Sequence, residues 1–355
     1  MSNVPARLHA ILARKADNAV VFRRGPSDQV AVIGWNLKND TFTPGQWFRG
    51  RIYEYRCDLT PDGRYLVYFA AKYGRTNPVE ERLKTLIAGE IGECPDQTWE
   101  ELLTFLKLTQ DFNWDDPASF PQSELPQAQY YREYKSVRTK LLRKYQKEFR
   151  KMRSSPDYRD ASWTGISRTP YLKTLDLWWN GSGWNGGGLF IDNSQVWINR
   201  PAPHRGTHIP AQRSGLFKEL SVPLEDWWGQ GGECPGIYFP RIERDGWIYQ
   251  TREAENFLYE KPLSNNLTLR KIFHCGPGDT PGQGVYREQH AVWADGKPLL
   301  DGSDWRWADY DAARNRILFA KAGVVYALKL DDPSGNPVLL CDFNNMKFKR
   351  LSAPY

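Results

Sequence analysis

The chain has 355 residues and a formal net charge of +6, and 14% of its residues are aromatic, with 15 Trp among them. Such an aromatic content excludes an intrinsically disordered chain, because disordered sequences are poor in large apolar rings. The sequence has no long apolar run, no signal-peptide pattern and only five scattered Cys, so we expect a cytoplasmic protein that does not span a membrane.

The N-terminal part predicts a series of short strands. Residues 20–22, 29–37 and 41–43 are rich in β-branched and aromatic side chains, and residues 51–57 alternate with a period of two. Between the later strands lies Pro61-Asp62-Gly63, in which Pro fixes one turn dihedral and Gly accepts a positive φ. We therefore expect an antiparallel hairpin around this turn.

The ten residues around that turn read LTPDGRYLVY, from Leu59 to Tyr68. This segment resembles the blade hairpins of β-propellers of the WD-repeat and prolyl-oligopeptidase-propeller kind, in which such a phrase joins two strands of one blade. The resemblance implies a propeller-type hairpin and implies nothing about function.

Residues 75–158 differ from the rest and predict helices. Asn77-Pro78 is a typical helix start, and 98–101 fit a capping box. Apolar residues then recur every three or four positions from 131 to 152, which predicts a helix over 127–153. We interpret 75–158 as a helical insertion between two parts of a β body, residues 1–74 and 159–355.

The β pattern returns after the insertion. Segments with the order strand, turn, strand are predicted at 242–249, 291–299 and 310–328, at intervals that are not constant. The prediction is a mainly β fold: an irregular β-propeller of about five blades that carries an inserted helical segment. A β-sandwich with the same helical insertion is the alternative.

The predicted helix 127–153 is strongly basic. Residues 130–153 hold ten Lys or Arg and two Glu, a net charge of +8, which leaves −2 for the rest of the chain. Structural helices usually mix signs on their exposed face, so this excess indicates an acidic partner. The candidate binding residues are Arg132, Lys135, Arg138, Lys140, Arg143, Lys144, Lys147, Arg150 and Lys151.

Catalytic and cofactor motifs are weak. Residues 181–186 read GSGWNG and match GxGxxG, but a strand pattern follows where a dinucleotide fold needs a helix. His204 and His208 lie four apart in a Pro-rich loop and could hold a metal with His290, but we predict neither a metal nor a cofactor. Four acids that flank Trp305 and Trp307 suggest either a sugar site or Asp side chains that cap their own turns. These acids are Asp301, Asp304, Asp309 and Asp311.

The sequence favours a non-enzymatic interaction scaffold that binds a partner protein with an acidic surface through loops and the basic insertion. One alternative is RNA or DNA binding along the basic helix. Another is a metal-dependent hydrolase with a site at the propeller mouth, where His204, His208 and His290 would act.

Overall fold

The computed structural model describes most of the β body. The described residues are 4–25, 29–72, 161–181, 185–199, 209–220, 234–253, 256–276, 285–333 and 335–355, together with Arg143, Lys144 and Lys147. The chain divides into two compact units, residues 1–72 with 160–355 and residues 73–159. Among the described residues, no helix is long and apolar enough to cross a membrane.

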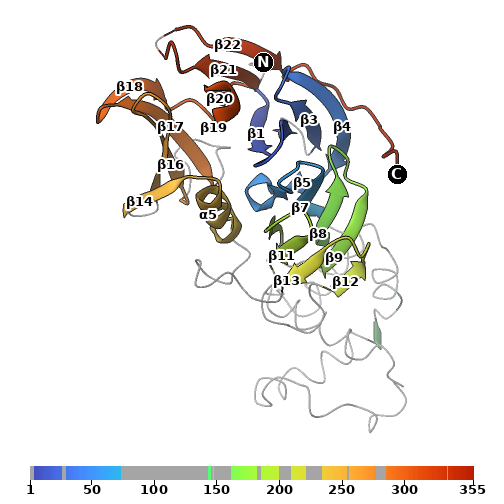
Figure 1. The fold of residues 1–355 in the computed structure, drawn as a ribbon. Helices are drawn as coiled ribbons and strands as arrows, with labels where there is room; N and C mark the ends of the chain where they lie inside the picture. The colour runs from blue at the N-terminus through green and yellow to red at the C-terminus, as the bar shows by residue number, and fades with distance from the viewer. Residues whose placement is uncertain are drawn as a thin grey trace. The chain divides into compact units, whose positions relative to one another are not determined.

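The first unit is mainly β, and its described strands form five sheets (Figure 1), which we name A to E in chain order. Sheet A holds β1 (Arg7–Leu12), β2 (Asn18–Arg24), β3 (Gln29–Asn36) and β4 (Thr41–Arg49). Sheet B holds β5 (Arg51–Ile52), β6 (Asp58–Leu59), β7 (Tyr65–Lys72), β8 (Ala161–Arg168), β9 (Thr174–Gly181) and β12 (Ile209–Gln212). Sheet C holds β10 (Gly188–Phe190), β11 (Gln195–Ile198) and β13 (Lys218–Leu220).

The last two sheets follow the helix α5 (Pro235–Arg244). Sheet D holds β14 (Ile248–Glu253), β15 (Asn256–Pro262), β16 (Leu267–His274), β17 (Arg287–Ala294) and β18 (Lys297–Gly302). Sheet E holds β19 (Trp307–Asp311), β20 (Arg316–Lys321), β21 (Val324–Lys329) and β22 (Val338–Asp342), with the 3-10 turn η4 (Ala312–Arg314) after β19. Sheets A, D and E are antiparallel, and strands that follow one another in the sequence lie side by side in them.

The turn chemistry accounts for the hairpins that the sequence predicts. Gly63 takes a φ of +71° between β6 and β7, and Gly296 takes +74° between β17 and β18. Asp40 lies in the left-handed region between β3 and β4, which Asp and Asn tolerate better than other residues with side chains. The hairpin around Pro61-Asp62-Gly63 is therefore confirmed in its local geometry.

Two local predictions are wrong. Residues 51–57 do not form one strand: β5 ends at Ile52, and the 3-10 turn η1 (Glu54–Arg56) follows. Ile242 lies in α5 rather than in a strand. There Gly246, at φ +95°, ends the helix, and Trp247 N–H donates to Ile242 O at 2.9 Å. The Asp-Gly pair that predicts a hairpin is thus a helix C-cap.

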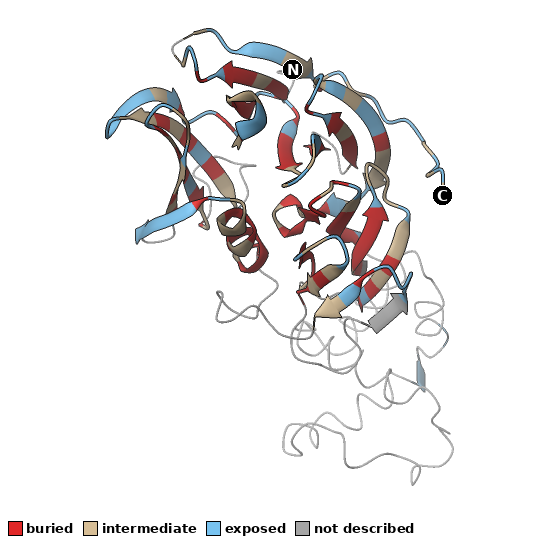
Figure 2. Ribbon diagram, in the orientation of Figure 1, coloured by how far each residue is buried: buried red, intermediate tan, exposed pale blue. Residues whose placement is uncertain are grey.

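Buried apolar side chains join the sheets pairwise. One cluster holds residues of sheets A and B, including Phe22 and Leu66, and another holds residues of sheets B and C, including Trp178 and Phe190. A third joins A to E through Trp35 and Leu318. The largest joins D, E and α5. Figure 2 shows the buried residues along β2, β3 and β7, whereas all six residues of β14 are exposed.

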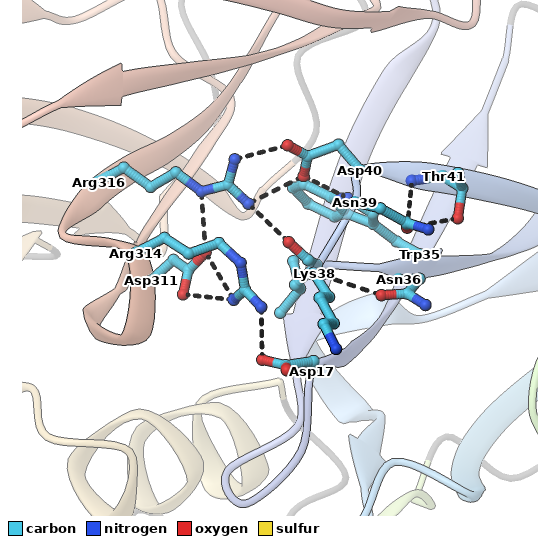
Figure 3. A network of polar contacts seen from close by, with 11 residues as sticks. Asp17, Trp35, Asn36, Lys38, Asn39, Asp40, Thr41, Asp311, Arg314 and Arg316 are labelled. Atoms are coloured by element: carbon cyan, nitrogen blue, oxygen red, sulfur yellow. Dashed lines mark hydrogen bonds and ion pairs between the residues drawn. The ribbon is translucent and has the colours of Figure 1, made fainter.

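Sheets A and E, from the two ends of the described chain, meet through side chains (Figure 3). The Arg316 guanidinium bonds both carboxylate oxygens of Asp40, at 2.6 and 2.9 Å, and its Nε donates to Asp311 at 2.9 Å. Arg314 lies between Asp311 and Asp17, 2.7 Å from the latter. No strand pairing joins these two sheets among the described strands.

The last residues run along sheet A and reach sheet B. Gln46 in β4 donates to Leu351 O at 2.9 Å, and Phe348 packs against Trp47. The Tyr355 hydroxyl accepts from the Arg168 N–H at 3.1 Å and donates to Lys173 O at 2.8 Å. Residues 343–355, which we call the C-terminal strap, therefore contact two sheets at once.

Candidate functional site: a buried polar centre

A group of polar side chains lies inside the β body, where α5 packs against sheets A and D. It is formed by His9 of β1, Tyr238 and Arg241 of α5, Lys271 of β16, and Glu288 and His290 of β17, and we call it the polar centre. Each of these residues is at most 4% exposed. Strand alternation accounts for the inward direction of three of them: Lys271 lies between the buried Leu269 and Phe273 on the core face of β16, and Glu288 and His290 share the core face of β17.

Glu288 is the carboxylate at the middle of the polar centre. Its Oε1 accepts a short hydrogen bond from the Tyr238 hydroxyl, and its Oε2 lies 3.4 Å from Lys271 Nζ. Lys271 Nζ also donates to Tyr238 Oη at 2.7 Å and lies 4.2 Å above the Trp247 ring. Burial alone would raise the pKa of Glu288, but the charge of Lys271 and the proximity of His290 lower it well below its usual range.

His290 is the other neighbour of Glu288. Its Nδ1 lies 3.1 Å from the Trp305 carbonyl oxygen, and because a carbonyl only accepts, Nδ1 carries the proton. Its Nε2 lies 3.1 Å from Glu288 Oε2, but neither of these atoms has a well-aligned hydrogen-bond partner among the described residues. Burial lowers the pKa of His290, while Glu288 opposes this effect.

Arg241 and His9 close the other side of the polar centre. Arg241 Nη1 donates to the carbonyl oxygens of Cys57 and Glu54, and its Nη2 lies 3.1 Å from His9 Nε2. A guanidinium only donates, so His9 Nε2 is the acceptor and the neutral ring carries its proton on Nδ1. Burial first, and then the charge of Arg241, lower the pKa of His9 well below its ordinary value.

This arrangement can hold charge and protons in fixed places, but it is closed to a substrate. The side chains of Glu288 and His290 are 0% exposed and that of Lys271 is 2% exposed. A lysine, a glutamate, a tyrosine and a histidine in mutual contact are the groups that acid–base chemistry uses. Here they bond one another inside the core, so the geometry fits a structural network that fixes α5 on the sheets.

Three of the nine candidate binding residues of the basic helix lie in the described part of the chain. Arg143, Lys144 and Lys147 are helical and exposed. The other six candidates of the basic helix lie outside the described residues: Arg132, Lys135, Arg138, Lys140, Arg150 and Lys151. His204 and His208 also lie outside them, and His290 is buried in the polar centre. Within the described ranges, no group of three His, Cys, Asp or Glu could hold a metal ion.

The four acids near the two Trp residues do not converge. Asp301 bonds the N–H and hydroxyl of Ser303 in its own turn. The other three each have a separate cationic partner: Asp304 pairs with Lys321, Asp309 with Lys261, and Asp311 with Arg316. Trp305 and Trp307 are buried, and Trp305 stacks on Phe319 with ring centres 4.0 Å apart. This geometry contradicts a sugar site here. The alternative, Asp side chains that cap their own turns, holds for Asp301, whereas Asp304, Asp309 and Asp311 are ion-paired.

The described end of the glycine-rich segment leads into a strand. After Gly181 ends β9, Gly187 takes a φ of +86° and the strand β10 follows, not a helix. A Cβ on Gly186 would lie 2.1 Å from the Phe69 ring, and one on Gly187 would lie 2.2 Å from Arg56 O. These glycines therefore allow β10 to approach β7 and η1 closely, and the dinucleotide interpretation fails.

The polar centre itself escaped prediction from the sequence. A signal exists in β16, where LTLRKIFH places Lys271 on the same face as three apolar residues. If this segment is assigned as a strand, Lys271 falls on its buried face, and a buried ammonium group requires a carboxylate partner. The carboxylate lies on β17, and only the observed register, Lys271 opposite His290, brings Glu288 near it.

Comparisons with known proteins are sparse. No protein-family model matches this chain, and no curated protein matches it significantly. Among solved structures, the chain is similar to the acylaminoacyl peptidase of Pyrococcus horikoshii, with 11% identity and a TM-score of 0.27. The match covers 97% of this chain and 46% of the peptidase, so this chain spans less than half of that protein's length. A likeness at this score carries no argument about fold or activity.

Proposed function

We propose that this chain is a non-enzymatic scaffold whose basic segment, residues 127–153, binds the acidic surface of a partner protein. The observation that carries the proposal is charge segregation: residues 130–153 hold a net +8 while the rest of the chain sums to −2. The described cations Arg143, Lys144 and Lys147 are helical and exposed. Arg143 and Lys147 are one turn apart, so they share a helix face.

The β body supports the scaffold role through the way its charges are used. The Asp58 carboxylate is bonded by both ends of the Arg244 guanidinium, at 2.7 and 2.9 Å. Glu54 accepts two bonds from Arg24, both at 2.7 Å. These carboxylates, like Glu288, neutralise cations inside the body and are engaged in holding sheets together. The basic segment, in contrast, has only two Glu for its ten Lys or Arg.

For the body we propose an irregular five-bladed β-propeller. The support is the order of contacts: buried clusters join sheets A to B, B to C, D to E and E to A, and α5 contacts both β10 and the core of sheet D. The hairpin at 59–68 resembles those of propeller blades.

The distance between sheets C and D tests the propeller. Spin labels at Gln195 in sheet C and at Thr251 in sheet D measure it. In a propeller these two sheets are neighbouring blades, so a separation of more than about 20 Å, twice the spacing of packed sheets, contradicts the proposal.

Binding to defined polyanions tests the proposed function. The probes are fluorescent poly-glutamate, single-stranded RNA and duplex DNA of equal length, titrated with the full chain in 50 and 200 mM salt. We expect poly-glutamate to bind, and the double variant Arg143→Glu/Lys147→Glu to bind at least tenfold more weakly. The matched control is Lys347→Glu/Lys349→Glu, which reverses two exposed cations of the C-terminal strap.

Each outcome decides between the candidate functions. Loss of binding in the helix variant alone supports the acidic-protein proposal. Nucleic acid that binds far more tightly than poly-glutamate, with affinity falling steeply as salt rises, favours the RNA or DNA alternative. Equal weakening in both double variants means that net charge alone acts, and the proposal is then wrong.

A further inference from the structure

A small pocket opens on the β body beside the polar centre and shares only Glu288 with it. Its volume is about 250 Å³, and it lies between the start of β17 and the turn that joins β18 to β19. The lining residues are Arg287, Glu288, Gln289, Ser303, Asp304 and Arg306. Drug-sized ligands occupy pockets of roughly 300–1,000 Å³, so this one suits an inorganic ion or a very small metabolite.

Two arginines and two acids line the pocket, but each acid lies beside another cation. The Glu288 carboxylate is 0% exposed and serves the polar centre. Asp304 pairs with Lys321 Nζ at 2.5 Å, so it does not compensate the arginines. Arg287 donates to the Gly276 carbonyl oxygen at 3.3 Å, a bond that leaves its charge uncompensated. Arg306 has no side-chain hydrogen bond or ion pair to any described residue, and its backbone N–H holds it to Ala320 O at 2.8 Å.

We propose that Arg287 and Arg306 bind a small dianion of the phosphate type in this pocket. Two guanidiniums present planar pairs of N–H donors that match phosphate oxygens, and together they balance a charge of −2. Free phosphate and the phosphate group of a small ester share this chemistry. The site is independent of the basic segment, so either proposal can fail without the other.

Calorimetric titration of the full chain with inorganic phosphate at pH 7.5 tests the site. We expect one phosphate bound per chain, and at least tenfold weaker binding in Arg306→Gln and in Arg287→Gln. Arg306→Lys keeps the charge but loses the planar donor pair, so we expect an intermediate affinity. The matched control is Arg350→Gln, which removes an exposed arginine of the C-terminal strap.

Thermal unfolding of each variant shows whether a loss of affinity reflects a loss of folding, and we expect these exposed or half-exposed substitutions to leave the melting temperature unchanged. Titrations with glycerol 3-phosphate and with succinate identify the ligand class. Tighter binding of the ester than of phosphate supports a phosphate ester. Tighter binding of succinate, an affinity unchanged in Arg306→Gln, or no binding of phosphate would overturn the proposal.

Discussion

Glu288 and Arg316 each hold an ion-paired network together, but the two networks lie in different surroundings. Glu288 sits among Lys271, Tyr238 and His290 with a side chain that is 0% exposed. Arg316 at the junction of sheets A and E is 10% exposed, and its partner Asp40 is 25% exposed. A buried charge that loses its partner cannot recruit water, whereas a group at a junction can. We therefore expect the burial of a network, and not the number of its bonds, to determine how much folding free energy is lost when it is broken.

The largest effect is expected at Glu288. Glu288→Ala leaves Lys271 buried without a carboxylate, which in comparable buried pairs costs about 3–5 kcal/mol. Urea unfolding of the variant measures this loss. The matched control is Glu260→Ala, which breaks an ion pair with Arg270 on the half-exposed face of the same sheet. The double variant Glu288→Leu/Lys271→Met should recover much of the stability, and a double variant as unstable as Glu288→Ala would show that the charges are not what matters.

A smaller loss is expected at Arg316. Arg316→Ala removes charge-assisted bonds to Asp40 and Asp311, each of a kind worth about 1.5–3 kcal/mol when counted alone. Water can solvate Asp40 after the change, so we expect a net loss of about 2 kcal/mol in urea unfolding. Arg316→Lys, which keeps the charge and one donor position, should lose about half as much. If Arg316→Ala matched Glu288→Ala, exposure would not explain the difference between the networks.

The stability of the folded chain should also depend on pH through the polar centre. The pKa of His9 is lowered in the folded chain by burial and by Arg241, so the unfolded chain takes up the proton first. Stability is therefore lost as the pH falls below about 6.5, the ordinary histidine value. The pKa of Glu288 is also lowered, and it adds a second loss below about 4.5.

His9→Gln isolates the first of these losses, because Gln keeps an acceptor for Arg241 and does not titrate. We expect its stability to fall less between pH 7 and pH 5 than that of the unchanged chain, by up to about 2 kcal/mol. His290, whose pKa is also lowered, accounts for a remaining slope. His274→Gln is the matched control, and an equal change of slope in both variants would contradict the assignment to His9.

The smallest effect is expected for the ion pair between Lys321 and Asp304, whose side chains are 48% and 55% exposed. Lys321→Ala should leave the midpoint of urea unfolding unchanged within the precision of the measurement, because water solvates both groups in either state. A clear loss of stability would show that this pair is part of a larger network.

Local patterns predict the hairpins of this fold well and the long-range contacts poorly. Pro61-Asp62-Gly63 and Asp295-Gly296 dictate tight turns through their own dihedral preferences, so the strands beside them follow from the sequence. Asp245-Gly246 carries the same signal but ends a helix, since Ile237, Tyr238 and Ile242 bury one face of α5. Nearby residues cannot distinguish these two uses of one dipeptide.

The polar centre could not be predicted because its members are distant in sequence. His9 and Arg241 are 232 residues apart, and their contact depends on how sheet A packs on α5. The strand β1 was itself missed, since RLHAIL is preceded by a segment without a clear turn signal. The basic segment, in contrast, is visible from composition alone, because charge counts require no knowledge of packing.

The junction of sheets A and E has a mechanical consequence. Strands within a sheet resist a pulling force through many backbone hydrogen bonds that share the load, but this junction is held by side chains alone among the described strands. A force applied to the two ends of the described chain would first peel away the C-terminal strap and then load the Arg316 contacts one after another. We therefore expect the β body to separate at the junction of sheets A and E at a lower force than is required to separate the strands within a sheet.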